Sequence, residues 1–449
     1  MLAACNIVYL LYHRQRLFSP LVSQSQALTA PLTALNLDAL ARRTGLVRRR
    51  PRKVHPLSFL QTCCLLATQH NVSLAGWACL WGMLTTSTLS KQAVAKRCSA
   101  GAVDFLRLVL QTVLAGLWRP PASVPKALRS FRRVLIQDST TLALASKLAA
   151  RFPGSRNQWQ KDMASLKIQV IYDLLSETFV HFALTPFTTN DQKASPMILE
   201  LARPGDLVIR DLGYAVLSVF QRAQAQGLYF LSRLRYGTAL FDPLTGQPLA
   251  LLQRLRAEGR CDTQVWLGTH KKIPVRLVAV PVPEAVAAER RRKARVNRDR
   301  RLHPSPEYLE LLGWDIFITN VSAEVWTAAT VAAVYGVRWR IEIWFKAWKS
   351  HFRLGELTAG SAEQIQLLIY GRLIWISLFQ ACLLRPLAQP GGLSLLKLAA
   401  WWQDYSLAWM LNGQSRLGWH HMLNQILYHC RYDRRRKRPN FHQKLDGLS

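Results

Sequence analysis

Three carboxylates of this 449-residue chain lie where a metal ion could use them. Asp138 follows a β-branched run that starts at Arg133. Asp211 follows a second such run, and Glu342 lies in a stretch with helical periodicity. Phosphodiester cleavage needs an activated oxygen nucleophile and a stabilised leaving oxygen, and two Mg²⁺ ions roughly 3.5–4 Å apart can provide both. Mg²⁺ prefers carboxylate and water oxygens to Cys or His, so two strand ends and a helix that carry these carboxylates would suffice.

Each upstream aspartate also has a purely structural interpretation. Asp138 could be the N-cap of a helix, because Ser139 and Thr140 follow it. Asp211 could form an Asx-turn that leads to Gly213. We interpret three further aspartates as structural: Asp173, Asp191 and Asp206, the last of which precedes its strand.

The stretch 335–349 is expected to be a helix after Gly336, because its apolar residues recur at 341, 344, 345 and 348. Arg338, Glu342 and Lys349 then fall on adjoining turns. The alternative is an ordinary amphipathic helix with a surface Arg–Glu pair. Since the chain has only 26 Asp and Glu against 59 Lys and Arg, a carboxylate among cations and tryptophans favours a site.

The order Tyr335-x2-Arg338-x3-Glu342-x6-Lys349 resembles the YREK signature of hairpin-forming DDE transposases, the insertion-sequence type-four family. The segments 138–140 and 211–214 occur in the family's order. The resemblance implies an RNase H-like catalytic domain with a β-rich insertion between the second Asp and the Glu. It also implies nicking with two Mg²⁺ ions, for which Mn²⁺ can substitute, followed by a DNA hairpin and strand transfer.

The same resemblance assigns DNA contacts. Tyr335, Arg338 and Lys349 would hold the terminal phosphates near the metals. We also expect DNA contacts from two other cations of the stretch, Arg340 and Lys346. Trp314, on the strand before the final helix, would stack on a flipped base, although core packing explains this residue equally well.

The net charge of +33 and a pI near 10.6 imply a polyanionic partner. We expect double-stranded DNA, both the terminal inverted repeats and the target. No phosphate-loop motif occurs, so no nucleotide cofactor is expected. Residues 363–384 are apolar but interrupted by Glu363, Gln366, Arg372 and Gln380, which favours a buried helix over a membrane span. The expected location is cytoplasmic and nucleoid-associated.

The predicted fold class is an α/β RNase H-like catalytic domain with a β-rich insertion, preceded by an all-helical N-terminal domain and followed by a helical C-terminal region. The expected boundaries are 1–125 for the DNA-binding helices, 126–235 and 313–385 for the catalytic domain, 236–312 for the insertion, and 386–449 for the C-terminal region. The insertion should hold strands near 249–252, 262–268 and 273–280 and a basic helix over 289–301.

The pattern predicts catalytic-domain strands over 133–137, 166–175, 178–184, 206–210, 228–234 and 314–320, with helices from about 216 and over 323–334. In the N-terminal part, helices are expected over 57–68, 73–84 and 101–116. Ser90 should cap a short helix whose outward face carries Lys91, Gln92, Lys96 and Arg97. That unit resembles a helix-turn-helix, but a plain bundle with a basic face fits nearly as well.

The remaining expectations concern DNA contact by the N-terminal arm, dimer formation and other possible functions. A basic N-terminal arm, ending in 48–53, should contact DNA backbone or simply face solvent. A homodimer on paired ends is expected through segment 393–430, with Trp401, Trp402, Trp409 and Trp419 as exposed aromatics. The alternatives are a domesticated RNase H-like nuclease or non-catalytic DNA-binding protein, and a structural nucleoid protein.

Overall fold

The structure is a computed structural model that describes residues 35–48, 54–70, 72–85, 87–121, 123–155, 163–296, 304–357, 360–387, 392–412, 416–433 and 439–449. The side chains of 407–412 and 416–420 lie outside this description. The arm over 1–34, most of the basic run that ends at Lys53 and the tail segment 434–438 also lie outside it.

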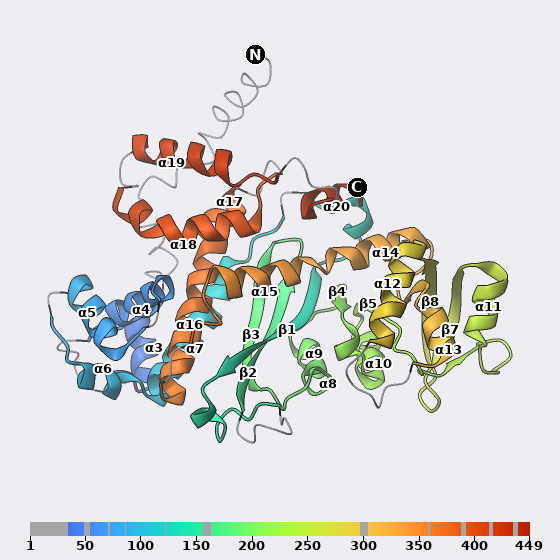
Figure 1. The fold of residues 1–449 in the computed structure, drawn as a ribbon, viewed down its shortest axis with the longest axis horizontal. Coiled ribbons are helices and arrows are strands. Elements are labelled where there is room, and N and C mark those ends of the chain that lie inside the picture. The colour runs from blue at the N-terminus through green and yellow to red at the C-terminus, as the bar shows by residue number, and fades with distance from the viewer. Residues whose placement is uncertain are drawn as a thin grey trace, which may run out of the picture.

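The described residues form one nine-stranded sheet in the order β3-β2-β1-β4-β5-β9-β8-β7-β6 (Figure 1). β1 pairs antiparallel with β2 and parallel with β4, and β4 pairs parallel with β5. The first five strands in this order, β3-β2-β1-β4-β5, have the RNase H-like arrangement, in which β1 to β3 are antiparallel and β4 and β5 run parallel to β1. The strands are β1 Val134–Leu144, β2 Ala164–Asp173, β3 Thr178–Pro186, β4 Leu207–Arg210, β5 Tyr229–Arg233, β6 Leu240–Phe241, β7 Cys261–Leu267, β8 Ile273–Pro281 and β9 Trp314–Thr319.

β1 runs well past Asp138, so the prediction of a strand end there is wrong, and so is the alternative of a helix N-cap. The antiparallel ladder with β2 continues from Leu135 to Leu144 and keeps the chain extended. Only the parallel pairing with β4 stops, at the pair Gln137–Arg210. Asp138 is therefore the first residue of β1 beyond its pairing with β4.

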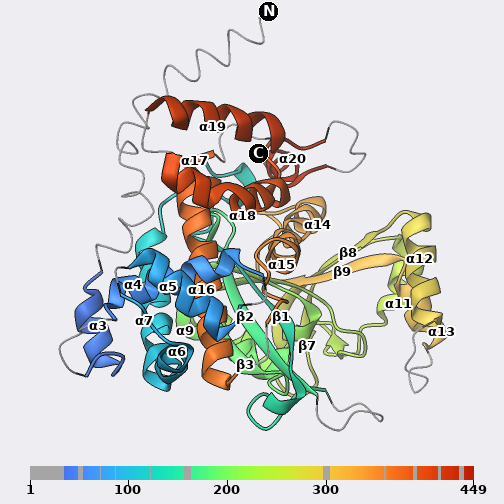
Figure 2. The ribbon, with the colours of Figure 1, turned by 60° about the vertical axis from the view of Figure 1, so that its left-hand side comes forward.

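The segment predicted as an insertion adds strands to the same sheet. β9 pairs antiparallel with both β5 and β8, so the β7–β8 hairpin continues the same layer. A strand over 249–252 is wrong, because α11 (Leu251–Glu258) begins there and buries Leu255. The basic helix α12 (Glu284–Arg295) starts earlier than expected, directly after Pro283. With α13 (Pro306–Leu311), it lies at the end of β8 and β9 away from the body (Figure 2).

Five described N-terminal helices precede the sheet: α3 Leu37–Arg43, α4 Pro56–Leu65, α5 Leu74–Leu84, α6 Lys91–Arg97 and α7 Ala100–Leu117. Ser90 caps α6 as predicted, since its side chain accepts a hydrogen bond from the Ala93 amide. Lys91, Lys96 and Arg97 are exposed on that helix.

The N-terminal helices pack on α16 (Ala362–Phe379), which belongs to the second part of the catalytic region. A Cβ at Gly371 would lie 2.4 Å from the Cys63 carbonyl oxygen, so α4 and α16 touch backbone to backbone. By length and composition, α7 and the helical run Ala362–Leu387 could each cross a membrane. Nearly all of α16 is buried inside the fold, which confirms the prediction of a buried helix.

The stretch that carries Glu342 forms two nearly continuous helices, α14 (Ala328–Val337) and α15 (Arg340–Ser350). α14 begins later than expected, where Thr327 caps it. Between the two helices, Arg338 and Trp339 keep helical dihedral angles. The predicted inward face is confirmed, because Trp344 and Trp348 are buried against Phe179, with ring centroids 4.9 Å and 5.3 Å away.

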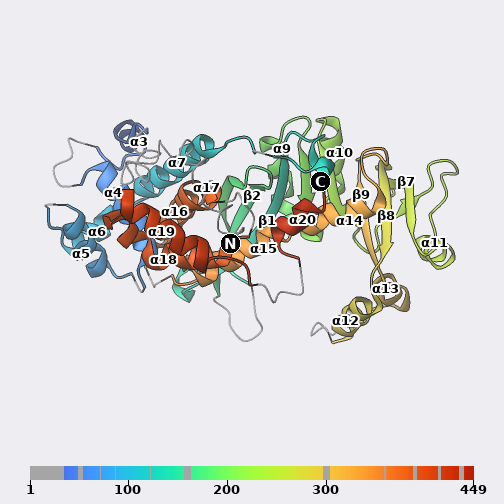
Figure 3. The same ribbon diagram turned by 90° about the horizontal axis from the view of Figure 1, so that it is seen from above.

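Three short helices connect strands: α8 Asp191–Ala194, α9 Ile198–Leu201 and α10 Leu217–Ala225. After the sheet, a π-helical turn at Gln380–Leu384 continues α16 into the short helix α17 Arg385–Leu387. Beyond them, α18 (Leu395–Asn412) and α19 (Arg416–His429) form a pair, and α20 (Phe441–Asp446) contacts α14. Seen from above, the N-terminal helices lie at one end of an elongated molecule and α11 at the other (Figure 3).

Trp402 is fully buried, so the prediction that it is exposed is wrong. α18 packs beside α15, and the Trp402 ring reaches α16, where its centroid lies 5.0 Å from that of Trp375. Trp401 is half-buried, 5.8 Å from the ring of Tyr405. The side chains of Trp409 and Trp419 lie outside the described residues.

Candidate active site

Asp138 and Asp211 are brought together by the end of the β1–β4 ladder. The last pair in that ladder is Gln137–Arg210, and each aspartate is the next residue along the chain. Asp138 still belongs to β1, whereas Asp211 directly follows β4. Adjacent strands lie about 4.8 Å apart. Because side chains alternate, Gln137 and Arg210 point to the opposite face, where the Arg210 guanidinium donates to Gln137 and to Ser195 Oγ at 2.7 Å.

Glu342 joins them through Arg338. One guanidinium nitrogen of Arg338 donates to Asp138 Oδ2 at 2.8 Å, and the other donates to Glu342 Oε1 at 3.3 Å. Asp138 and Arg338 are 200 residues apart in sequence, so this contact depends entirely on the fold. The predicted Arg–Glu pair on adjoining turns is confirmed, but it contacts β1 rather than facing solvent.

The electrostatics of the site reflect three carboxylates whose charges all act on Arg338. Burial raises the pKa of Asp138 to about 7, the Arg338 guanidinium and the Ser139 amide oppose that rise, and the charges of Glu342 and Asp211 add to it. The side chain of Asp138 is 15% exposed and that of Glu342 is 37% exposed, so solvent reaches the site mainly over the helix. A single guanidinium among three carboxylates leaves an excess of negative charge.

That excess, carried by hard oxygen donors, suits a divalent cation such as Mg²⁺. Within the described ranges, no three Asp, Glu, His or Cys side chains lie close enough together to hold one ion. Arg338 lies among the three carboxylates: Asp138, Asp211 and Glu342 all interact with its charge. The donor set fits the cation in type and charge.

Tyr335 lies behind Arg338 and is half-buried. Its ring packs 5.0 Å from Phe317, and the guanidinium carbons of Arg338 and Arg233 lie 5.8 Å and 5.9 Å from its centroid. Arg233, at the end of β5, also forms an ion pair with Asp315. No local pattern distinguishes Arg233, because only the pairing of β5 with β9 brings it here.

The cations of α15 divide into two groups. Lys346 and Lys349 are exposed, as DNA contacts require. Arg340 is not, and its prediction as a DNA contact is wrong: its side chain is 1% exposed, paired with Glu177 and packed 4.2 Å from the ring centroid of Phe441. One turn of helix separates Arg340 from buried Trp344, so it shares the inward face.

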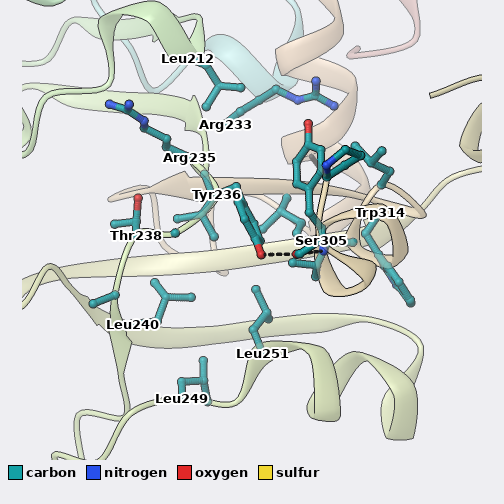
Figure 4. A pocket seen from close by; sticks show the side chains of 18 of the residues that line it. Leu212, Arg233, Arg235, Tyr236, Thr238, Leu240, Leu249, Leu251, Ser305 and Trp314 are labelled. Atoms are coloured by element: carbon teal, nitrogen blue, oxygen red, sulfur yellow. Dashed lines mark hydrogen bonds between the residues drawn. The ribbon is translucent and has the colours of Figure 1, made fainter. Parts of the chain in front are cut away.

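Trp314 lines an open cavity of about 1100 Å³ that begins beside Asp211, at Leu212 and Gly213, and extends to the insertion (Figure 4). The indole nitrogen of Trp314 donates to the Gly259 carbonyl oxygen at 2.8 Å, and the ring is half-buried. The wall of the cavity also includes arginines and tyrosines: Arg233, Arg235, Arg290, Tyr236 and Tyr308.

An RNase H-like sheet with two carboxylates just beyond the last residue pair of two parallel strands, and a third on a helix beside them, defines a class of phosphodiester-cleaving enzymes. The family profile described as "Transposase DDE domain" matches residues 129–378, a span that contains Asp138, Asp211 and Glu342. The chain belongs to this family of insertion-sequence transposases, which are metal-dependent enzymes of DNA cleavage and strand transfer.

Known relatives agree. The chain is 30% identical over 381 residues to the transposase for insertion sequence element IS231D of Bacillus thuringiensis subsp. finitimus, covering 79% of this chain and 78% of the relative. It is 26% identical over 326 residues to the transposase for IS1151 of Clostridium perfringens, covering 67% and 68%. The resemblance seen in the sequence is thus confirmed at the level of the DDE transposases.

Proposed function

We propose that this transposase belongs to the hairpin-forming YREK branch, binds the terminal inverted repeats of its element, and carries out cut-and-paste transposition. Cleavage, hairpin formation and strand transfer would use one centre made of Asp138, Asp211 and Glu342. The observation that carries the proposal is the double hydrogen bond of Arg338 to Asp138 and Glu342. These two hydrogen bonds connect the Arg and the Glu of the YREK pattern to Asp138, the first aspartate.

The three carboxylates would hold two Mg²⁺ ions, which Mn²⁺ can replace. When bound, such ions supply an activated nucleophilic oxygen and a stabilised leaving oxygen. Asp138 and Asp211 would provide ligand oxygens just beyond the last residue pair of β1 and β4, and Glu342 would provide ligand oxygens from α15. No nucleotide cofactor is part of the proposal.

The helix residues beside the carboxylates would hold the DNA end. Lys346 and Lys349 project from α15 into solvent, where each can meet a phosphate as a point charge. Arg338 and Tyr335 lie deeper and would face the phosphate that reacts. Trp314 offers a half-exposed ring in the cavity beside Asp211, which supports the proposal that it stacks on a flipped base.

Other parts of the chain would serve binding and assembly. The exposed cations of α6 and of α12 would contact duplex backbone, because phosphate neutralisation needs only charge. Two protomers would pair two ends through the C-terminal helices. We place the protein in the cytoplasm with the nucleoid DNA, and we keep the domain boundaries given above as part of the proposal.

The proposal is tested by incubating the protein with Mg²⁺ and DNA that carries the inverted repeats flanking its gene, beside scrambled DNA and an EDTA control. We expect nicks at the repeat boundaries, then hairpins and double-strand breaks, on the repeat DNA alone. Cleavage of both DNAs would indicate a general nuclease. Binding without cleavage would indicate a domesticated or structural DNA-binding protein.

A further inference from the structure

A further acidic side chain, that of Asp191, is hydrogen-bonded to the residue that follows Asp138. Asp191, the first residue of α8, accepts a hydrogen bond on Oδ1 from Lys167 Nζ at 2.9 Å. Lys167 lies on β2 and is 8% exposed, although lysine is rarely buried unless it is paired. The pair lies beside the stretch of β1 that follows Asp138, because Lys167 is the register partner of Thr141.

The same oxygen of Asp191 is joined to the strand of the first catalytic aspartate. Ser139 Oγ donates to Asp191 Oδ1 at 2.9 Å. The amide of Ser139 donates to Asp138 Oδ1 at 2.8 Å. Ser139 therefore connects the two aspartates, and a shift of Asp191 acts on the residue that orients the Asp138 carboxylate.

Asp191 also contacts the turn that carries the second catalytic aspartate. A Cβ at Gly213 would lie 3.0 Å from Asp191 Oδ2 and 3.3 Å from its Cβ, so the turn after Asp211 is packed directly on this side chain. α8 and the turn Leu212–Tyr214 are in contact as elements. One side chain thus contacts β1 just after Asp138 and the chain just after Asp211.

We propose that Asp191 is a positioning residue that orients the Asp138 and Asp211 carboxylates for metal binding, while Lys167 neutralises its charge. The inference rests on the proposed role of Asp138 and Asp211 as metal ligands. Hydrogen-bonded partners of ligating groups orient them, and their loss typically weakens metal binding about 10- to 100-fold. Without Lys167, Asp191 would be a further unpaired anion beside the site.

Mn²⁺ binding to the full-length protein, followed by the loss of the free-ion EPR signal, tests the proposal without relying on activity. Asp191→Ala should weaken Mn²⁺ binding by up to about 10-fold, the lower end of the effect of losing a direct partner of a ligand, because Asp191 acts through Ser139. Asp191→Asn should recover part of the loss, since its amide oxygen still accepts from Ser139. The Mg²⁺ concentration for half-maximal DNA cleavage should rise in the same order.

Asp206 provides a matched control, because it lies next to β1 and β4 but away from the proposed site. Asp206, fully buried before β4, pairs with Arg133 at the opposite end of the ladder from Asp191. Asp206→Asn should lower the melting temperature but leave Mn²⁺ affinity within twofold of the wild type. A general loss of packing would instead change both variants alike.

Ser139→Ala removes the connection between Asp191 and β1 and keeps the Lys167 pair, so it decides the matter if Asp191→Ala does not fold. We expect severalfold weaker Mn²⁺ binding from it. Wild-type Mn²⁺ affinity in folded Asp191→Ala, or in Ser139→Ala, would overturn the proposal. Wild-type affinity in Asp138→Asn would show instead that the metal site itself has been misplaced.

Discussion

Arg338 donates to two carboxylates from different elements, so it has a second role besides any contact with DNA phosphate. Arg338→Ala should reduce nicking, hairpin formation and double-strand breaks together, by about 100-fold or more. Arg338→Lys should recover little, because the donors of an ammonium group share one nitrogen, whereas the guanidinium reaches Asp138 and Glu342 from two separate nitrogens. Lys349→Ala, on the exposed side of α15, should impair hairpins more than nicks. Gels that resolve the three products check this, and a hairpin-selective loss in Arg338→Ala would contradict it.

Arg340 is expected to contribute to stability rather than to DNA binding. Removing one partner of a buried ion pair typically costs about 3–5 kcal/mol, so Arg340→Ala should lower the free energy of unfolding by roughly that amount. Its partner Glu177 is 12% exposed, which leaves the carboxylate without solvent compensation. Urea unfolding measures the change, with exposed Lys346→Ala as the control. Equal stability of both variants would show that the pair contributes little.

The sequence identified the residues that carry a spaced motif and missed those that only the fold places. Asp138, Asp211 and Glu342 could be selected as candidates because each lies in a short pattern of its own, and the fold brings all three to Arg338. Asp191 is 52 residues from Ser139 and was interpreted as structural, since nothing local distinguishes it from other loop aspartates. Arg340 was misassigned because charge alone suggested exposure, whereas the helical period places it inward.

At the level of elements, strand and helix types were mostly predictable, and their limits were not. β1 extends beyond Asp138 because β2 pairs with it over ten residues, a long-range contact that no local pattern encodes. Segment 249–252 has the leucine content of a strand, but Leu251 and Leu255 lie one helical turn apart in α11. Short apolar runs of this kind fit either structure.

α6 provides an element-level prediction. Its exposed cations, Lys91, Lys96 and Arg97, are expected to contact the backbone of end DNA. Replacing all three with Ala should weaken end binding and reduce the slope of log affinity against log salt by up to about 3. Fluorescence anisotropy at several salt concentrations measures both quantities. An unchanged slope would place the end-binding surface elsewhere.

At the scale of the whole molecule, the N-terminal helices and the catalytic region share one core. α4 and α7 pack on α16, and Trp402 of α18 reaches the same core. Deleting the N-terminal helices would therefore expose a long apolar helix. Point substitutions on exposed faces separate DNA binding from folding better than truncations do.

Assembly is also a property of the whole molecule. We expect two protomers on two paired ends, with an interface that includes exposed aromatics of the C-terminal helices, such as Tyr405 and Tyr428. Tyr405→Ser with Tyr428→Ser should reduce end pairing at least tenfold and leave the melting temperature unchanged. Light scattering of the DNA complex measures the stoichiometry. A fully active complex of one protomer with one end would contradict this expectation.

The most direct test of the central claim is DNA cleavage by the Glu342→Gln variant in Mg²⁺. The substitution keeps the size of the side chain and the acceptor for Arg338 but removes the charge that a metal ligand needs. We predict that nicking of end DNA falls below detection, while binding to the same DNA stays within a few-fold of the wild type. Nicking at the wild-type rate would contradict the assignment of Asp138, Asp211 and Glu342 as the catalytic centre.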